Sequence, residues 1–334
     1  MRVLIVGGGS IGTRHLRNLR ALGVDAVAVA DPEAPRREVA LAEGAQRVFA
    51  DLEAGFAWKP TIALITSPSH LHVAQAQQAA LRDCHLFIEK PLSHSTEGLH
   101  ALAATVAQRG LISLVGCNMR FHPGPAKVKE LLQEEKIGRI LFARVHTGSY
   151  LPGWRPTQDY RKSYSAQAKQ GGGCILDCIH EIDLARWYLG EVTEVFCIAE
   201  RRSTLEVDTE DVAMLLCRHA DGVLSEVHLD FVQRTYERGC HIVGADGSIF
   251  WDFREGSVRL FEAKGERWST FRQPDDFQVN QIYVDEMRHF LECVDQRRPT
   301  TLPVADGVRV MALALAAKRS AQEKRLVATG SILA

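Results

Sequence analysis

The segment LFIEKPLSHS, residues 86–95, places a Lys–Pro pair directly after an apolar run that is typical of a buried strand. Pro91 lacks an amide hydrogen and pushes Lys90 towards an extended backbone, which suits neither a continuing strand nor an ordinary helix start. A lysine fixed in this way can stabilise an oxygen that gains negative charge in a reaction, or lower the pKa of a neighbouring acid–base group. The alternative is a loop of solvated charges.

A second group of reactive residues lies in GGGCILDCIHEIDLARWYLG, where three glycines lead into a predicted helix. On one helix, the spacing of three residues puts Asp177 and His180 on a common face, and also His180 and Asp183. A histidine beside a carboxylate suits general base catalysis, because its unperturbed pKa lies near 6.5. The alternative is a histidine whose hydrogen bonds are satisfied within the core.

The long segment before this helix, GSYLPGWRPTQDYRKSYSAQAKQ, is rich in aromatic and basic residues. Aromatic rings pack on the apolar faces of sugar rings, and basic side chains pair with carboxylate or phosphate. We therefore expect a substrate-binding loop that contains Trp154, Arg155 and Tyr160. Arg120, from NMRFHP, is expected to reach the same ligand. The alternative is a long surface loop.

The start of the chain carries a phosphate-binding pattern. VGGGSIGTRHL follows an apolar run and places Gly7, Gly9 and Gly12 in a G-x-G-x-x-G arrangement, which permits a tight turn and close approach of the backbone to a pyrophosphate. Asp31 ends the second apolar run, nineteen residues after Gly12. A carboxylate there can accept hydrogen bonds from the adenosine ribose and would repel a 2'-phosphate, which predicts NAD as the cofactor. Arg36 and Arg37 are near enough to leave NADP open.

Two further runs end at the edge of the sheet where such folds bind ligands. ITSPSHLH is expected to place Ser67 and Pro68 near the ribose or nicotinamide, whereas His72 has the alternative of a surface position at a helix start. Glu89 and Lys90 follow the fifth run at the same edge. The residues expected to bind the cofactor are Gly7, Gly9, Ser10, Ile11, Gly12, Asp31, Ser67, Pro68, His72, Glu89 and Lys90.

The elements that must position these residues form two patterns. Residues 1–121 alternate continuous apolar runs with helices, which indicates a doubly wound parallel sheet of the Rossmann type. Residues 122–334 contain successive strand-like runs separated by tight turns, which predicts an α+β domain with a large, mostly antiparallel open sheet. The predicted helices lie near residues 11–22, 35–43, 71–81, 96–108, 175–189, 279–296 and 305–324.

Several motifs together make the chain resemble a known family, the glucose–fructose oxidoreductase and inositol dehydrogenase family (Gfo/Idh/MocA). They are GGGSIG, SPSHLH, EKP, GCNMRFHP and GGGCILDCIHEIDLARW, and the resemblance covers nearly the whole chain. It implies that Lys90 is an active-site residue, with Glu89 orienting it or the nicotinamide amide. It also implies that His180 takes a hydroxyl proton, with Asp177 beside it. The spacing of Asp177 and His180 is three residues here and usually four in the better-studied sugar dehydrogenases.

We therefore expect an NAD(P)-dependent oxidoreductase that transfers a hydride between the nicotinamide and a secondary hydroxyl or ketone. The substrate would be a sugar, sugar acid, nucleotide sugar or cyclitol, with Lys90 and His180 converging beside the nicotinamide. One alternative is a dinucleotide-sensing regulator without catalysis. Another is an epimerase or lyase that oxidises its substrate only transiently and shows no net redox change. Family analogy also predicts a homodimer or homotetramer formed through the C-terminal sheet.

Composition narrows the class of protein. The 334 residues carry a formal net charge of -1, which argues against nucleic-acid binding. No apolar run approaches the roughly 18 residues that span a bilayer. The first residues read as a strand and not as a signal peptide, so a cytoplasmic location with reduced cysteines is expected. Cys174 and Cys178 do not have a usual zinc spacing, so no metal is expected.

Overall fold

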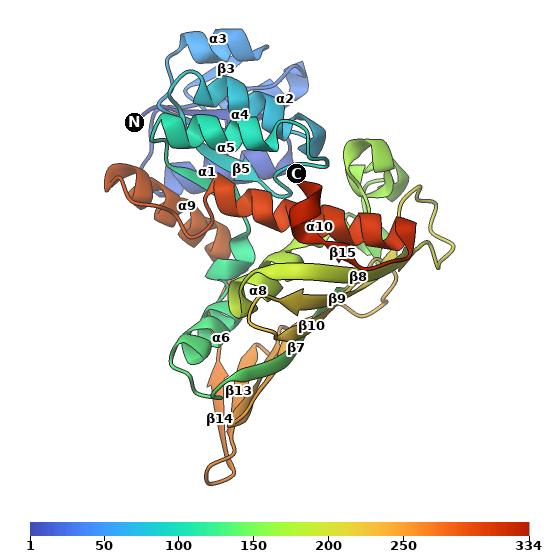
Figure 1. The fold of residues 1–334 in the computed structure, drawn as a ribbon. Coiled ribbons are helices and arrows are strands. Elements are labelled where there is room, and N and C mark those ends of the chain that lie inside the picture. The colour runs from blue at the N-terminus through green and yellow to red at the C-terminus, as the bar shows by residue number, and fades with distance from the viewer. Residues whose placement is uncertain (334) are drawn as a thin grey trace. The chain divides into compact units, whose positions relative to one another are not determined.

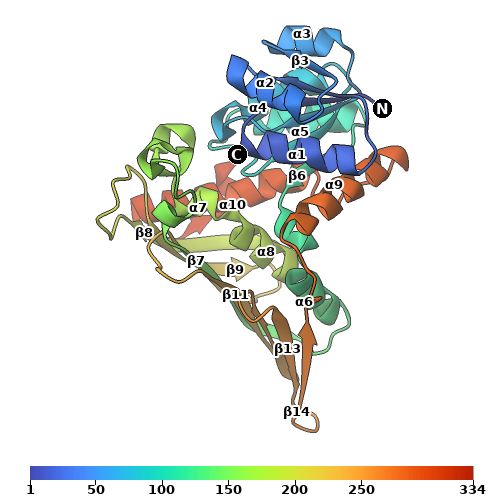
Figure 2. The ribbon, with the colours of Figure 1, turned by 180° about the vertical axis from the view of Figure 1, so that it is seen from behind.

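The computed structural model describes residues 1–333. Its first unit, residues 1–118 and 278–311, contains a six-stranded parallel sheet in the order β3-β2-β1-β4-β5-β6. Helix α5 lies in front of this sheet in Figure 1, and α1 lies in front of it in the opposite view of Figure 2. The strands are almost wholly apolar because helices cover both faces. The bounds are β1 (Val3–Val6), α1 (Ser10–Ala21), β2 (Val27–Ala30), α2 (Ala34–Ala42), β3 (Arg47–Phe49), α3 (Leu52–Ala57), β4 (Ile62–Ile65), α4 (His72–Ala80), β5 (His85–Glu89), α5 (Leu99–Gln108), β6 (Ser113–Gly116) and α9 (Asn280–Asp295).

Residues 278–311 return to the first unit after strand β14 (Arg267–Arg272) of the second sheet. Phe290 of α9 contacts Phe87 of β5 with ring centroids 5.7 Å apart. Asn280 also donates a hydrogen bond of 2.9 Å to Asn18 on α1. The predicted boundary at residue 121 is close to the end of the first segment at residue 118, but the predicted second domain included the returning segment. The hydrophobic pattern predicts that α9 exists, but it does not show which sheet the helix packs against.

The second unit, residues 119–277 and the C-terminal residues from 312, contains a nine-stranded sheet. The strand order is β14-β13-β12-β11-β7-β10-β9-β8-β15, and all neighbours are antiparallel except β7 and β10. Together with the parallel sheet, this confirms the predicted fold class. The bounds are α6 (Pro123–Gln133), β7 (Ile140–Gly148), α7 (Cys174–Asp177), α8 (Ile179–Leu189), β8 (Val192–Glu200), β9 (Val212–His219), β10 (Leu224–Asp230), β11 (Glu237–Gly244), β12 (Gly247–Asp252), β13 (Ser257–Glu262), β14 (Arg267–Arg272), α10 (Val304–Glu323), whose first residues belong to the first unit, and β15 (Val327–Ala328).

Only one face of this large sheet is covered. Along β9 the side chains alternate, so that Ala213 and Leu215 are fully buried whereas Met214 is 49% and Leu216 is 58% exposed. Helix α8 lies against the sheet in Figure 2, and it packs on β7 and β10. An antiparallel sheet with one covered and one open face is the arrangement that such alternation predicts.

The structure differs from the predicted elements in a few places. The helix predicted over residues 175–189 is two helices, because Cys178 leaves helical geometry with φ −89° and ψ 33°. The short helix α3 was not predicted, although Asp51 caps it by accepting a hydrogen bond from the Ala54 amide at 2.8 Å. Helix α6 also lies outside the predicted helices, because the prolines in its first turn were read as a break in the pattern.

The acid sensitivity of the fold should depend on His122. Burial and the nearby Arg238 charge lower the pKa of His122 to about 4, whereas the unfolded chain takes up the proton near pH 6.5. The contribution of neutral His122 to the free energy of unfolding is therefore intact above pH 6.5. About 3 kcal/mol of it is lost as the pH falls to 4. His122→Asn keeps an acceptor for the Gly124 amide and should shrink the loss of unfolding free energy over this range by that amount. Urea titrations from pH 7 to 4 measure this, with the exposed His100→Asn as control. Equal losses in wild type and His122→Asn would contradict the prediction.

Candidate active site

The glycine turn between β1 and α1 has little room for side chains. Gly7 has φ +104°, and a Cβ there would lie 2.8 Å from the Ser67 amide nitrogen. A Cβ on Gly12 would lie 2.0 Å from the Gly7 carbonyl oxygen, so residues 7 and 12 must be glycine for the turn to close. By contrast, a Cβ on Gly9 would meet nothing within 4 Å. Ser10 and Ile11 begin α1, and first-turn amides of this kind are free to bind an anion.

These glycines provide a matched test of the turn. Gly12→Ala should lower NADH affinity by at least about 100-fold and destabilise the protein. The new Cβ would clash with the Gly7 carbonyl oxygen, and no side-chain movement relieves that clash because the oxygen belongs to the backbone. Gly9→Ala should keep the stability of the wild type, since its methyl group enters open space, and should lose affinity only if a pyrophosphate passes close to Gly9. NADH fluorescence titration and thermal unfolding measure the two effects. A Gly12→Ala variant that binds NADH normally would refute the role of the turn.

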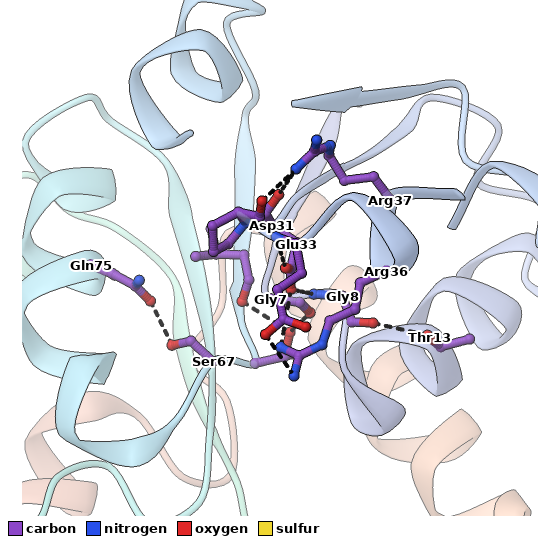
Figure 3. A network of polar contacts seen from close by, with 12 residues as sticks. Gly7, Gly8, Thr13, Asp31, Glu33, Arg36, Arg37, Ser67 and Gln75 are labelled. Carbon is purple, nitrogen blue, oxygen red and sulfur yellow. Dashed lines mark hydrogen bonds and ion pairs between the residues drawn. The ribbon is translucent and has the colours of Figure 1, made fainter. Parts of the chain in front are cut away.

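The Asp31 carboxylate is buried at the end of β2 and is held by backbone amides (Figure 3). Its Oδ2 accepts a hydrogen bond of 2.7 Å from the Gly8 amide, and its Oδ1 accepts one of 2.8 Å from the Glu33 amide. The carboxylate therefore fixes the glycine turn to β2 and stands where the ribose of a dinucleotide is expected. The closed turn, the α1 amides and this carboxylate together fit NAD.

The two arginines that left NADP open have different surroundings (Figure 3). Arg37 donates to the backbone carbonyls of Asp31 at 2.7 Å and Pro32 at 2.8 Å, so its guanidinium is engaged. Arg36 is partly exposed, with Nη1 3.6 Å from Asp31 Oδ2 and Nη2 3.1 Å from Glu33 Oε1. Arg36 is therefore the residue that still leaves NADP open.

His72, which is predicted to bind the cofactor, contacts two backbone carbonyls. It is buried, with Nε2 2.7 Å from the Ser67 carbonyl oxygen and Nδ1 2.9 Å from the Pro91 carbonyl oxygen. Burial lowers the pKa of His72, although both carbonyls and the Glu89 charge favour the protonated ring. We therefore interpret His72 as a structural link between the loops that follow β4 and β5. Ser67, at the same edge, donates to Gln75 Oε1 at 2.6 Å, and Pro68 precedes a short 3-10 turn.

Lys90 follows β5 directly, and its peptide bond to Pro91 is cis. The neighbouring Glu89 side chain turns back towards α1, where its Oε1 lies 2.7 Å from His15 Nε2. Its Oε2 accepts a hydrogen bond of 3.2 Å from the Lys90 amide. Glu89 thus holds the backbone of Lys90. Sequence reasoning missed His15, although a histidine on the buried face of a helix indicates a polar partner nearby.

In the second unit, Asp177 ends α7 and His180 lies in the first turn of α8. The two are not on one continuous helix, so the predicted common face does not apply to them. Both side chains are buried. Asp177 accepts hydrogen bonds from the Tyr164 hydroxyl at 2.7 Å and the Ser165 hydroxyl at 2.5 Å. These bonds tie the loop before α7 to the helix end, and Ser165 is a further residue that the sequence did not single out.

Arg120, which is predicted to reach the substrate, forms a buried ion pair with Asp183. Its guanidinium donates to both oxygens of Asp183, from Nε at 2.8 Å and from Nη2 at 2.6 Å, in a pair that is nearly inaccessible to solvent. A second ion pair also involves a residue of α8, because Arg238 Nε lies 2.7 Å from Glu181 Oε1. Burial lowers the pKa of Arg238, but Glu181 and other nearby groups raise it by more, so the pKa is raised overall. Two buried ion pairs therefore hold α8, which carries His180.

The predicted substrate loop consists of short 3-10 turns between β7 and α7. Trp154 is partly exposed and donates to the Ser149 hydroxyl at 2.7 Å. The Tyr160 hydroxyl accepts a hydrogen bond of 3.1 Å from the Glu206 amide, and Arg155 is exposed. The loop therefore keeps the Trp154 and Arg155 side chains at its surface. Hydrogen bonds of Trp154 and Tyr160, however, serve to stabilise the conformation of the loop.

Within residues 1–333, no group of three or more His, Cys, Asp or Glu side chains is arranged to hold a metal ion. In the same part of the chain, no helix has the length and apolar character needed to span a bilayer. The eight cysteines, all within residues 1–333, are buried, and none of them forms a disulfide.

The doubly wound sheet, its glycine turn and the fixed Asp31 define a dinucleotide-binding protein, and comparison with known proteins identifies its family. Residues 1–117 match the model of an oxidoreductase family with an NAD-binding Rossmann fold, and residues 126–250 match the GFO/IDH/MocA C-terminal domain. The chain belongs to the GFO/IDH/MocA family of NAD-binding oxidoreductases. The predictions of family, oxidoreductase class and NAD as cofactor are thereby confirmed.

Several relatives are similar over the whole chain. A myo-inositol 2-dehydrogenase of Thermotoga maritima is 29% identical over 98% of this chain and 98% of its own length. A scyllo-inositol 2-dehydrogenase (NAD(+)) of Bacillus subtilis is 28% identical over 96% and 94%. A levoglucosan dehydrogenase solved in complex with NADH and levoglucosan has the same fold, with a TM-score of 0.89 and 22% identity over 98% of this chain and 99% of that one.

Proposed function

We propose that the chain is an NAD-dependent dehydrogenase that oxidises a secondary hydroxyl of a sugar or cyclitol, or reduces the corresponding ketone. The observation that carries the proposal is the position of Lys90, which directly follows β5 at the same edge as the glycine turn and has its backbone held by Glu89. The full-length similarity to two inositol dehydrogenases supports the substrate class.

Each proposed catalytic residue has a role that its chemistry suits. His180 takes the proton of the substrate hydroxyl as general base. Lys90 donates a hydrogen bond to the same oxygen and stabilises the negative charge that develops there. Asp177, held by Tyr164 and Ser165, sets the polar surroundings of the histidine. Bound NAD supplies the hydride acceptor, with Gly7, Gly9, Gly12 and Asp31 as the residues that would hold it.

Ion pairs within the loop favour a neutral polyol over an acidic substrate. Arg161, one of the basic residues that suggested an acidic ligand, pairs with Asp159 at 2.8 Å and with Glu206 at 2.7 Å. Both partners raise its pKa, so the guanidinium stays charged and its charge is balanced within the loop. This leaves less positive charge at the loop to attract a carboxylate or a phosphate.

The experiment is a panel of inositols, neutral sugars, anhydrosugars, sugar acids and nucleotide sugars, scored by absorbance at about 340 nm with NAD and NADP in parallel. We expect NADH formation with at least one neutral polyol. Turnover of substrate without net absorbance change would identify an epimerase or lyase instead. Tight NADH binding with no turnover on any member would favour a sensor.

We also propose a homodimer or homotetramer that forms through the open face of the nine-stranded sheet. This face carries exposed apolar side chains on neighbouring strands, among them Ile198, Met214, Leu216 and Leu224. Contiguous apolar patches of this kind mark association surfaces. Leu216→Asp should shift the particle to the monomer mass in light scattering, and Leu326→Asp, an exposed apolar residue next to the short edge strand β15, should not. A monomeric wild type would refute this assembly.

A further inference from the structure

His15 is a buried polar residue to which the proposed reaction assigns no role. It lies in the middle of α1, with a side chain that solvent does not reach at all. Its ring makes edge contacts with Phe87 at 4.9 Å and with Tyr283 at 6.2 Å. Nδ1 is buried without a hydrogen-bond partner among residues 1–333, so the Glu89 carboxylate is the polar contact of this ring.

The Glu89 side chain joins two parts of the cofactor domain. One oxygen lies 2.7 Å from His15 Nε2 on the helix that follows the glycine turn, and the other accepts the Lys90 amide at 3.2 Å. The neighbouring strand leaves space for it, since a Cβ on Gly116 would lie 3.3 Å from Glu89 Oε2. The carboxylate is therefore held through both oxygens, one by His15 and one by the Lys90 amide.

We propose that His15 is a positioning residue for Lys90. By holding Glu89, it fixes the backbone from which the lysine side chain projects, and it ties that backbone to the helix that carries the dinucleotide-binding turn. The inference rests on the proposed role of Lys90. Loss of the His15 bond frees a mostly buried carboxylate to turn away, and the Lys90 amide then loses its acceptor.

The first test compares three single variants and one double variant. His15→Leu should lower kcat by about 10- to 100-fold, as loss of an outer-shell partner does, with the dissociation constant for NADH changed less than about threefold. His15→Gln can still donate to Glu89 and should recover most of the activity. Glu89→Leu and the double variant His15→Leu/Glu89→Leu should have the same kcat within about twofold, because both act through one contact. Additive losses, or a His15→Gln variant no better than His15→Leu, would overturn the proposal.

The second test needs no substrate, so it separates this proposal from the dehydrogenase assignment. The rate at which an amine reagent labels Lys90 is followed by peptide mass spectrometry in the NADH complex, with the exposed Lys264 as internal reference. We expect the rate at Lys90 to change at least about threefold in His15→Leu and to stay near wild type in His15→Gln. Gly116→Ala would place a Cβ 3.3 Å from Glu89 Oε2, so it shifts the carboxylate by a few tenths of an ångström without altering His15. It should change the labelling rate in the same direction even if His15→Leu does not fold. Unchanged labelling of Lys90 in Gly116→Ala and in any folded His15→Leu would refute the link.

Discussion

Replacing His180 by alanine is expected to lower kcat on the true substrate by about 100- to 10,000-fold, the usual contribution of a general base. In free energy this is about 3–5 kcal/mol of lost transition-state stabilisation. The residue lies in the first turn of α8, and the Arg120–Asp183 and Arg238–Glu181 pairs hold this helix independently of it. The variant should therefore fold, and the loss should lie in catalysis. Initial rates at saturating NAD and substrate measure it.

The control and the pH profile make this prediction specific. His100→Ala, at an exposed position on α5, should keep the wild-type rate. NADH affinity should be the same in both variants, because His180 belongs to the other unit of the chain. In the wild type, kcat/KM should fall at acid pH as the base is protonated, and this limb should disappear in His180→Ala. Wild-type turnover in His180→Ala would remove the histidine from the mechanism.

The sequence predicts the fold where a hydrophobic pattern is compatible with few arrangements of strands and helices. Continuous apolar strands alternating with helices leave few arrangements besides a parallel sheet covered on both faces, and alternating strands predict a half-covered sheet. The return of residues 278–311 to the first unit was not accessible, because α9 has an apolar face that fits either sheet. The break at Cys178 was not accessible either, since the flanking sequence has helical composition throughout.

Individual residues of the candidate site could be singled out from the sequence, but the contacts between residues far apart in the chain could not. Gly7, Gly12 and Asp31 were singled out from backbone geometry, and the structure gives each a local reason, whereas a Cβ on Gly9 would meet no neighbour. The contact between His15 and Glu89 joins residues 74 positions apart, and no local spacing predicts it. Arg120 is a second case, because its basic side chain near a predicted site suggests a substrate role, while its ion-pair partner, Asp183, is 63 positions away and no local spacing predicts that pair.

Replacing Lys90 by methionine is expected to lower kcat by about 100- to 1,000-fold, comparable to the loss of one donor to a developing oxyanion. Methionine keeps much of the apolar stem and removes the ammonium group, and the Glu89 bond to the residue 90 amide does not depend on the side chain. The backbone should therefore hold its place. The chemical step should become slower relative to product release, so a substrate deuterated at the reacting carbon should show a larger isotope effect than in the wild type.

Two comparisons separate loss of this ammonium group from a general loss of positive charge. Lys264→Met, at an exposed residue of the β13–β14 turn, removes the same charge and should leave kcat unchanged. Lys90→Arg keeps the charge but presents a planar group with different reach, so its activity should lie between wild type and Lys90→Met. NADH affinity should change less than about tenfold in both Lys90 variants, since the glycine turn and Asp31 carry most of the binding. If Lys90→Met lost NADH binding in the same proportion as kcat, the lysine would serve the cofactor and not the reacting oxygen.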